Sequence, residues 1–338
     1  MEKRSNINRR DFLQMAATLG IGISLYPHSS YGALPAQRKG KRIGIIGLDT
    51  SHSIEFVRTL NAPDIGDAYE GYTVTAAYPY GSREIKSSYS RIEDYTKQVK
   101  KHGVTIASSL DELLKVTDVI MLETNDGRLH KEQAKRVFEA GKTVFIDKPV
   151  AASYRDVVRI YEMAEQYKVP LFSSSTLRYV ENMEMLRNGS LAGKILGADT
   201  FCPCEIEPSH PDIFWYGVHG VEMLFAVMGI GCSTVQRVHT ASTDIVTGVW
   251  EDGRTGVFRG TRTGVSSFGG MAYGEKGNVP IKGYNGYEPL LHKIIDFYKT
   301  GIPPVSSKET IELYAFMEAA DESKRQNGKA ISLAKLEF

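Results

Sequence analysis

Residues with catalytic potential fall at three points of the sequence. The segment Gly47-Leu-Asp49-Thr-Ser-His52 follows the short apolar run KRIGIIG. Lys148 follows a second apolar run, KTVFID, and a lysine there can hold a hydroxyl group or lower its pKa. His219 and Glu222 are three residues apart, which places them on one face of a helix, and a histidine suits proton transfer near neutral pH. These residue types predict acid–base chemistry at a hydroxyl group.

The first segment occupies the place of the glycine-rich turn G-x-G-x-x-G of dinucleotide-binding folds. Only Gly47 fits this pattern, because Asp49 replaces the second glycine and His52 the third. A carboxylate repels a diphosphate, whereas a helix N-terminus with the hydroxyls of Thr50 and Ser51 attracts one. Two interpretations therefore stay open: a bound dinucleotide, or a helix cap with His52 packed behind it.

The segment after the second strand lacks the carboxylate that would hold the ribose of NAD. Tyr78-Pro79-Tyr80-Gly81-Ser82-Arg83 instead offers Ser82 and Arg83, which could meet the 2′-phosphate of NADP, or it forms a loop of turn residues. The choice between NAD and NADP stays open.

The stretch around His219 permits three interpretations. Trp215 could stack on a sugar ring beside a catalytic His219. Alternatively, His219 and Glu222 could bind a metal ion together with His210 and Asp212, or His219 could simply be packed in the core. The residues alone leave these three interpretations open; the resemblance described below favours acid–base catalysis, and no metal site is assigned.

Short apolar runs alternate with helical patterns up to about residue 173. This alternation predicts a doubly wound α/β domain whose parallel sheet is covered on both faces. The expected strands are 41–47, 72–78, 117–122, 142–147 and 171–175, with a helix after each of the first, third and fourth. The pattern then changes to longer strands at 196–206, 233–251, 255–268 and 270–281, with helices near 212–228, 287–300 and 308–326. The second half is therefore predicted to be an α+β domain with an open, mainly antiparallel sheet.

The composition excludes several classes of protein. The chain has 338 residues, of which 42% are apolar, so it can form a sizeable core. It has 41 basic and 40 acidic residues without a basic block beyond the first ten, which argues against nucleic acid as a partner. Three cysteines cannot form a disulfide scaffold in a chain of this length.

The first 36 residues resemble an export signal. Arg9 and Arg10 precede the apolar run MAATLGIGISLY, and small residues follow near Ala33 and Ala36. Paired arginines in this layout are typical of a twin-arginine signal, which the export machinery recognises. The run is too short to span a bilayer, so we expect a periplasmic or otherwise exported protein without stable membrane insertion.

Motifs in matching order from residue 41 to residue 333 resemble the Gfo/Idh/MocA family, the group of glucose–fructose oxidoreductase and inositol dehydrogenase. They are the GIIG turn, TNDGRLH, EAGKTVFIDKPVA, STLRY, GKILGA, the HGVEMLFAVMG helix and MEAADESKRQNGK. The resemblance implies a Rossmann domain, an open-faced second domain, and NAD(P)-dependent redox chemistry on sugar or cyclitol hydroxyls. It also implies a homo-oligomer.

The resemblance transfers roles to individual residues. Lys148 matches the lysine of the family's Glu-Lys-Pro motif, with Asp147 in place of glutamate, and His219 matches the catalytic histidine. Trp215 stands where the family has an aspartate, so the usual carboxylate–histidine pair is in question. The expected catalytic residues are Lys148, His219 and Glu222. The expected cofactor contacts are Gly47, Asp49, Thr50, Ser51, His52, Thr124, Asn125, His130, Asp147 and Lys148, and the expected substrate contacts are Arg178, Asp212, Trp215 and Tyr216.

These features together predict three segments: a signal at 1–36, a Rossmann-like domain at 41–172 and a substrate and oligomerisation domain at 173–338. The expected activity is an NAD(P)-dependent oxidoreductase that acts on a sugar, cyclitol or glycoside hydroxyl and keeps its cofactor tightly bound, because free dinucleotide is scarce outside the cytoplasm. Two alternatives remain. One is a glycoside lyase or hydrolase with recycled or no dinucleotide, and the other is a non-catalytic sugar-binding protein.

Overall fold

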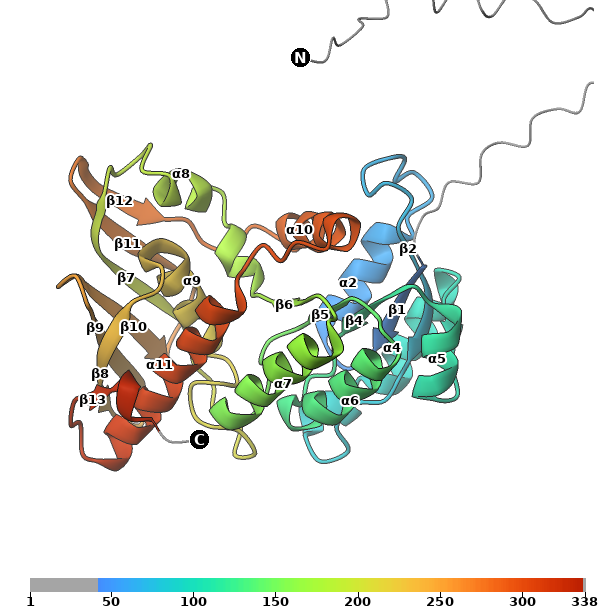
Figure 1. Cartoon of the computed structure of the whole chain (residues 1–338), viewed down its shortest axis with the longest axis horizontal. Coiled ribbons are helices and arrows are strands. Elements are labelled where there is room, and N and C mark those ends of the chain that lie inside the picture. The colour runs from blue at the N-terminus through green and yellow to red at the C-terminus, as the bar shows by residue number, and fades with distance from the viewer. Residues whose placement is uncertain (1–41, 337–338) are drawn as a thin grey trace, which may run out of the picture. The chain divides into compact units, whose positions relative to one another are not determined.

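The strand–helix alternation of the first half builds a six-stranded sheet in the computed structural model, which describes residues 42–336 (Figure 1). Its strand order is β3-β2-β1-β4-β5-β6 and every neighbouring pair is parallel. This is the strand order of the dinucleotide-binding fold. The strands are β1 (Arg42–Ile46), β2 (Thr73–Tyr78), β3 (Thr105–Ile106), β4 (Val119–Leu122), β5 (Val144–Ile146) and β6 (Leu171–Ser173). The prediction of a doubly wound sheet is confirmed.

Helices cover both faces of this sheet because its central strands are apolar on both sides. One face packs against α5, α6 and α7, and the other against α2 and α4. The helices of this half are α2 (Ser51–Leu60), α3 (Lys86–Tyr89), α4 (Ile92–Lys101), α5 (Leu110–Val116), α6 (Gly127–Glu139) and α7 (Tyr154–Tyr167). The predicted start of α7 is correct, since the Ser153 side chain accepts a hydrogen bond from the Asp156 backbone N–H.

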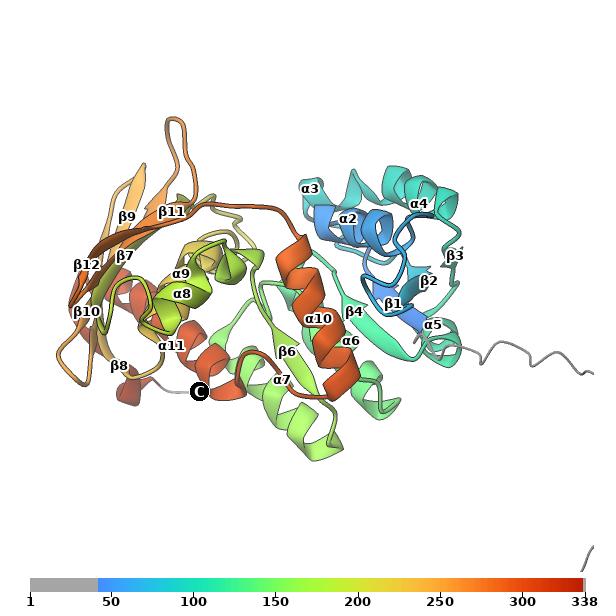
Figure 2. The same ribbon diagram turned by 90° about the horizontal axis from the view of Figure 1, so that it is seen from above.

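A helix from the far end of the chain completes the cover of the first sheet. The helix α10 (Glu288–Thr300) runs beside β6 (Figure 2). Its Phe297 packs edge-on against Phe172 of β6, with ring centroids 4.8 Å apart. Tyr298 donates a hydrogen bond of 2.6 Å to the Ile120 carbonyl in β4. The chain thus returns to the first sheet after forming most of the second.

The second sheet is mixed but mainly antiparallel, as expected. Its order is β12-β11-β7-β10-β9-β8-β13, and only the pair β7 and β10 is parallel among the described strands. Its strands are β7 (Ile195–Pro203), β8 (Cys232–His239), β9 (Thr243–Trp250), β10 (Thr255–Thr261), β11 (Gly269–Gly274), β12 (Gly277–Ile281) and β13 (Ile331–Ser332).

Four expected boundaries in this half are wrong, one of them that of the strand expected at 255–268, which ends at Thr261. The strands predicted at 233–251 and 270–281 are both hairpins, the first closed by a hydrogen bond from the Thr240 N–H to the Thr243 carbonyl. The helix predicted from residue 212 begins only at Val218, because residues 211–217 form turns. Turn-forming residues inside an apolar, β-branched stretch were not recognised.

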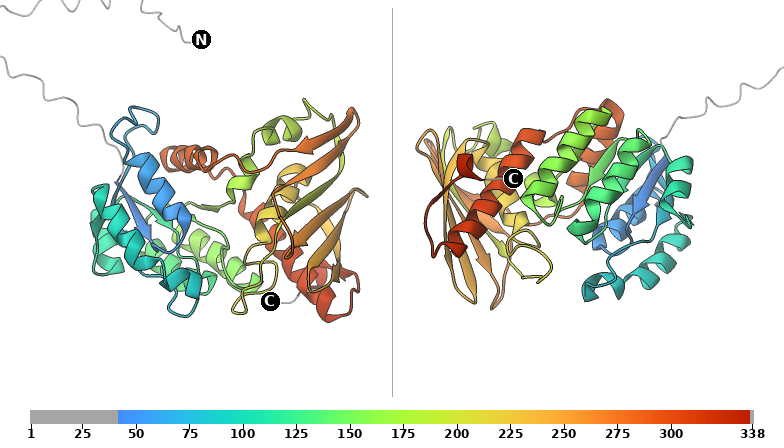
Figure 3. Two further views of the ribbon diagram at one scale, coloured as in Figure 1. Left: turned by 180° about the vertical axis from the view of Figure 1, so that it is seen from behind. Right: turned by 60° about the horizontal axis from the view of Figure 1, so that its bottom comes forward.

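Helices cover only one face of the second sheet (Figure 3). They are α9 (Val218–Met228) and α11 (Ser307–Arg325), whose apolar side chains continue the core that lies under α6 and α7. Shorter elements are η1 (Thr176–Tyr179), α8 (Met183–Arg187) and η2 (Leu333–Lys335). Within residues 42–336, no helix has the length and apolar character needed to cross a membrane. The predicted signal at 1–36 lies outside the described residues.

Candidate active site

The carboxyl ends of the first sheet face a cavity of about 360 Å³, shared with the second half of the chain. Open α/β sheets bind their ligands at these strand ends. Nine of the predicted site residues line the cavity: Thr50, Ser51, His52, Asn125, Asp147, Lys148, Trp215, Tyr216 and His219. The other lining residues include Glu205, Phe268, Tyr284 and Tyr287.

Gly47 shapes the turn between β1 and α2. Its φ is +91°, and a Cβ on this residue would lie 2.5 Å from the Thr124 backbone nitrogen. Only glycine therefore permits the ends of β1 and β4 to approach each other this closely. Gly47 thus determines the shape of the turn that leads into α2, but it does not line the cavity.

Asp49 turns away from the cavity into the protein. Its Oδ1 accepts a hydrogen bond of 3.1 Å from the Asn125 N–H, and its Oδ2 accepts from the Ser82 N–H and the Ser88 hydroxyl. Burial raises the pKa of Asp49 to about 6, against the effect of these hydrogen bonds. The carboxylate that the sequence places next to a diphosphate thus joins the segments around Ser82, Ser88 and Asn125 and does not line the cavity.

The N-terminus of α2 presents hydroxyl groups to the cavity. The Thr50 side chain caps the helix by accepting from the Ser53 N–H at 3.3 Å. The Ser51 hydroxyl lies 3.3 Å from the Tyr287 hydroxyl. A helix N-terminus with such donors fits an anionic diphosphate. The donor set at this end of the cavity therefore suits a dinucleotide despite the altered turn.

The segment after β4 contributes one cavity residue and two buried ones. Asn125 lines the cavity, whereas Thr124 and His130 are buried. Both ring nitrogens of His130 contact backbone carbonyls, Nε2 that of Thr124 at 2.6 Å and Nδ1 that of Val150 at 3.1 Å. Burial lowers the pKa of His130. His130 therefore joins the ends of β4 and β5 from inside the core.

Lys148 and His219 meet at the cavity from opposite halves of the chain. Lys148 Nζ lies 5.7 Å from the ring centroid of Tyr216, and the Tyr216 ring packs edge-on against His219 at 5.1 Å. His219 Nδ1 lies 2.7 Å from the Ser175 hydroxyl, so Nε2 is the ring nitrogen left for a ligand. Burial, followed by the charges of Lys148 and His52, places the pKa of His219 well below its usual value. The site thus pairs a cation with a neutral imidazole.

Glu222 and Arg178 lie behind the cavity lining. Glu222 Oε1 accepts hydrogen bonds from Arg178 Nε at 2.5 Å and from the Ser174 hydroxyl at 2.9 Å. Arg178 also pairs with Glu309. Arg178 was expected to contact substrate and Glu222 to transfer a proton. This arrangement does not support either role, because the two side chains pair with each other behind the cavity.

Asp212 is also placed elsewhere. It accepts hydrogen bonds from Arg237 at 2.9 Å and from Lys324 at 2.5 Å in a separate charged network of the second sheet. His210 accepts from the Gly127 N–H at 3.1 Å and packs against Trp215 with ring centroids 4.8 Å apart. The metal set considered from the sequence, His210, Asp212, His219 and Glu222, is therefore not assembled.

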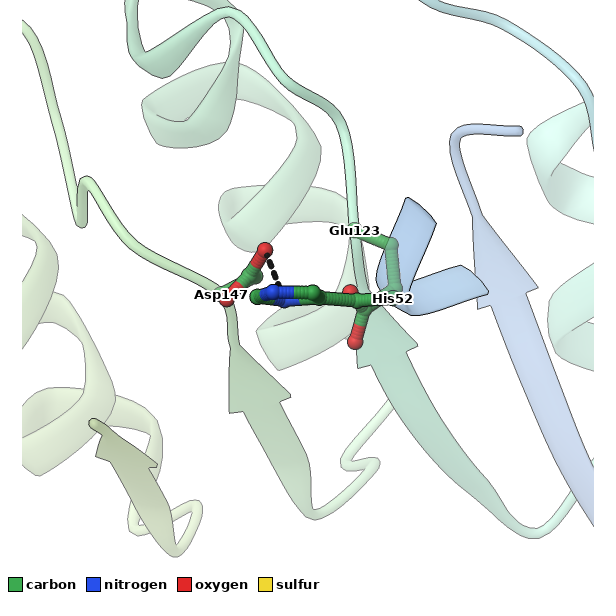
Figure 4. A group of neighbouring side chains, drawn as sticks. All are labelled: His52, Glu123 and Asp147. Atoms are coloured by element: carbon green, nitrogen blue, oxygen red, sulfur yellow. Dashed lines mark ion pairs between the residues drawn. The ribbon is translucent and has the colours of Figure 1, made fainter. Parts of the chain in front are cut away.

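One cavity-adjacent residue lies in a segment that the sequence singles out, but no role is assigned to it from the sequence. Glu123, at the end of β4, is buried beside His52 and Asp147 (Figure 4). Burial and then the charge of Asp147 raise the pKa of Glu123 well above its usual value. Burial also favours the neutral form of Asp147, but interactions with His52 and Lys148 outweigh it and lower the Asp147 pKa. An acidic residue directly after an apolar strand, in the same position as Asp147 after β5, is the signal that could have revealed Glu123.

The fold and cavity are those of an α/β protein of the dinucleotide-binding type, and comparisons with known proteins relate part of the chain to one family. Residues 41–175 match the family described as "Oxidoreductase family, NAD-binding Rossmann fold". This part of the chain is therefore similar to the Gfo/Idh/MocA oxidoreductases. The resemblance found in the sequence is confirmed, as is a nicotinamide dinucleotide as the cofactor of the family.

Individual relatives are distant. An uncharacterized oxidoreductase of Streptococcus pneumoniae is 28% identical over 117 residues, which are 33% of this chain and 32% of that protein. The match thus spans about a third of the length of this curated relative. The myo-inositol 2-dehydrogenase of Lactobacillus plantarum is similar in structure, with a TM-score of 0.69, 15% identity, and coverage of 87% of this chain and 99% of that one. The scyllo-inositol dehydrogenase of Lactobacillus casei, solved with NAD(H) and scyllo-inositol, has a TM-score of 0.69, 13% identity and coverage of 88% and 100%. These likenesses show that the covered 87–88% of this chain shares their fold.

Proposed function

We propose that this protein is an NAD(P)-dependent oxidoreductase that acts on a hydroxyl of a sugar, cyclitol or glycoside. The observation that carries the proposal is the meeting of Lys148 and His219 at one cavity, with the N-terminus of α2 on the dinucleotide-binding half. The inositol named for one structural neighbour is a ring of hydroxyl groups, which supports the substrate class.

The first half of the chain would hold the cofactor. Thr50 and Ser51 would bind the diphosphate at the start of α2, while Asn125, Asp147 and Lys148 would surround the nicotinamide end. When bound, the nicotinamide supplies the hydride acceptor. The chain's own residues then have to position the substrate carbon and remove the hydroxyl proton.

Lys148 and His219 have different roles in the removal of the hydroxyl proton. The ammonium of Lys148 can donate a hydrogen bond to the substrate oxygen and stabilise the charge that develops on it. Neutral His219 can accept the hydroxyl proton at Nε2, and the Ser175 hydroxyl fixes the ring through Nδ1. Trp215 and Tyr216 offer aromatic faces against which a sugar ring can stack.

Export would require that the cofactor remain bound through turnover. We extend the proposal to a protein that is exported by the signal at 1–36 with its dinucleotide already loaded. Such an enzyme would catalyse an internally balanced reaction, either redox exchange between two sugars or elimination and hydrolysis of a glycoside.

The test begins with the cofactor. Mature protein is purified from cells with an intact twin-arginine route, denatured, and analysed for NAD(H) and NADP(H) by mass spectrometry. We expect about one dinucleotide per chain. Absence of release, combined with no binding in titrations of the purified protein, would reject the oxidoreductase and leave the cofactor-free hydrolase or the sugar-binding protein.

A matched pair of variants tests where the diphosphate of the cofactor binds. Ser51 is the first residue of α2, where a carboxylate suits the helix dipole but repels a diphosphate. Ser51→Glu should therefore fold normally and lose the dinucleotide, whereas the neutral Ser51→Gln should retain most of it. Equal cofactor content in the two variants would contradict the assigned diphosphate position.

The outer face of the second sheet supports the expected homo-oligomer. Phe201, Val238 and Val249 are exposed on β7, β8 and β9. Each alternates along its strand with buried side chains, so all three lie on the face of the sheet opposite to the described helices α9 and α11. Exposed apolar side chains on this open face support an interaction surface. Light scattering should detect an oligomer that Val238→Glu dissociates, and a monomeric wild-type protein would refute this part of the proposal.

A further inference from the structure

The ends of β4 and β5 carry two buried carboxylates that converge on one imidazole. Glu123 follows β4, Asp147 follows β5, and His52 comes from the first turn of α2 (Figure 4). One ligand atom from each side chain lies within 4.8 Å of the other two. Glu123 has no part in the proposed hydroxyl chemistry, so the cluster calls for its own explanation.

The Glu123 carboxylate lacks hydrogen-bond donors. Neither of its oxygens accepts a hydrogen bond from any of the described residues, although the side chain is fully buried. Asp147 is less isolated, because its Oδ2 lies 2.8 Å from His52 Nδ1 and the Lys148 backbone N–H donates to its carboxylate. Asp49, a buried carboxylate nearby, receives three hydrogen bonds. Buried polar atoms are almost always satisfied, so the contrast between Asp49 and Glu123 points to a bound group that pairs with the Glu123 oxygens.

We propose that His52, Glu123 and Asp147 bind a divalent transition-metal ion of the Zn²⁺ or Mn²⁺ type. Two carboxylates balance the charge of a dication, and the imidazole nitrogen favours a transition metal over Mg²⁺ or Ca²⁺, which prefer oxygen ligands alone. Small side-chain rotations would bring the three ligand atoms to the bond lengths of about 2.0–2.2 Å that such ions require.

The ion would have an open coordination position toward the cavity. His52 and Asp147 line the cavity, whereas Glu123 lies behind them. Three protein ligands with one position left for water or a ligand oxygen are characteristic of catalytic metal sites, whereas structural sites are closed. A hydroxyl-bearing ligand beside Lys148 is the class of molecule that this position would take.

The test measures the metal directly. Untagged protein is analysed for bound metals, stripped with a chelator, and titrated calorimetrically with ZnCl₂ and with MnCl₂. We expect one ion per chain and a higher melting temperature in its presence. Glu123→Gln and His52→Asn should each weaken binding at least tenfold, with melting temperatures measured in chelator to show that both variants fold.

Two control variants carry the same kinds of substitution at residues outside the cluster. Asp49→Asn alters a buried carboxylate whose oxygens are already satisfied, and His292→Asn removes an exposed imidazole. Both should bind the ion within threefold of the wild-type affinity.

Either of two results would overturn the proposal. One is a wild-type protein that binds neither ion. In that case, if metal-free Glu123→Gln is as stable as the wild type, the two carboxylates share a proton instead. The other is ion binding that persists unchanged in both cluster variants. Because dinucleotide content is measured separately, failure of the metal site is distinguishable from failure of the proposed oxidoreductase function.

Discussion

Arg178 and Glu222 form a buried ion pair, with Arg178 Nε and Glu222 Oε1 2.5 Å apart. The resemblance to the family places both residues in the site, one as a substrate contact and the other as a catalytic acid. The pair instead joins η1 to α9 and fixes the helix that carries His219. The ion pair therefore helps to hold His219 in position.

The ion pair predicts a large effect on stability. Glu222→Gln leaves the Arg178 guanidinium with Glu309 as its remaining carboxylate partner, so the free energy of unfolding should fall by about 2–4 kcal/mol. Denaturant unfolding measures this loss. In a double-mutant cycle, Arg178→Met combined with Glu222→Met should cost clearly less than the sum of the two single changes. Additive losses would show that the two groups are not coupled.

Lys148 should be essential for turnover. Lys148→Met retains much of the aliphatic side chain but removes the ammonium that faces the substrate oxygen, so kcat/KM should fall at least about 100-fold. The measurement uses the sugar or cyclitol that wild-type protein oxidises, with the melting temperature as the check of folding. Lys282→Met, an exposed lysine, is the matched control and should leave activity unchanged. Turnover of Lys148→Met at the wild-type rate would refute its role.

The low pKa of His219 predicts the pH dependence of the reaction. Burial and the nearby cation Lys148 keep the imidazole neutral at neutral pH. It therefore remains able to accept a proton as the pH falls, and loses this ability only below the usual histidine value of about 6.5. The acid limb of kcat/KM against pH should lie below 6.5. His219→Asn should lower kcat/KM by about 10²–10⁴-fold and abolish this limb, and a limb retained in the variant would assign it to another group.

Asp49 predicts a different pH effect, on folding. Its pKa is raised from 3.8 to about 6, so the folded state binds this proton more tightly than the unfolded state. Stability from this group is therefore present at low pH and lost as the pH rises from about 4 to 6, by up to about 3 kcal/mol. Denaturant unfolding of wild type and Asp49→Asn at several pH values isolates the effect. A difference between the two proteins that does not vary with pH would contradict it.

At the site, the sequence did not indicate where a side chain lies when its partners are distant in the sequence. Asp49 sits 33 positions before Ser82 and 76 before Asn125, and its orientation depends on both. Glu222 meets Arg178 across 44 positions. Sequence spacing of three or four residues can assign a helix face, but it does not show which charged group lies opposite that face.

The sequence by itself determined the first sheet, its two-sided cover and the resemblance to the Gfo/Idh/MocA oxidoreductases, and it pointed to Lys148 and His219, which line one cavity. These follow from local apolar periodicity and from motifs, which act over a few residues. Tertiary structure decided the rest: α10 returns to the first sheet, Glu123 joins His52 and Asp147, and Arg178 neutralises Glu222. Such relationships depend on which segments pack together, because burial makes each charged group require a partner that only the folded chain brings within reach.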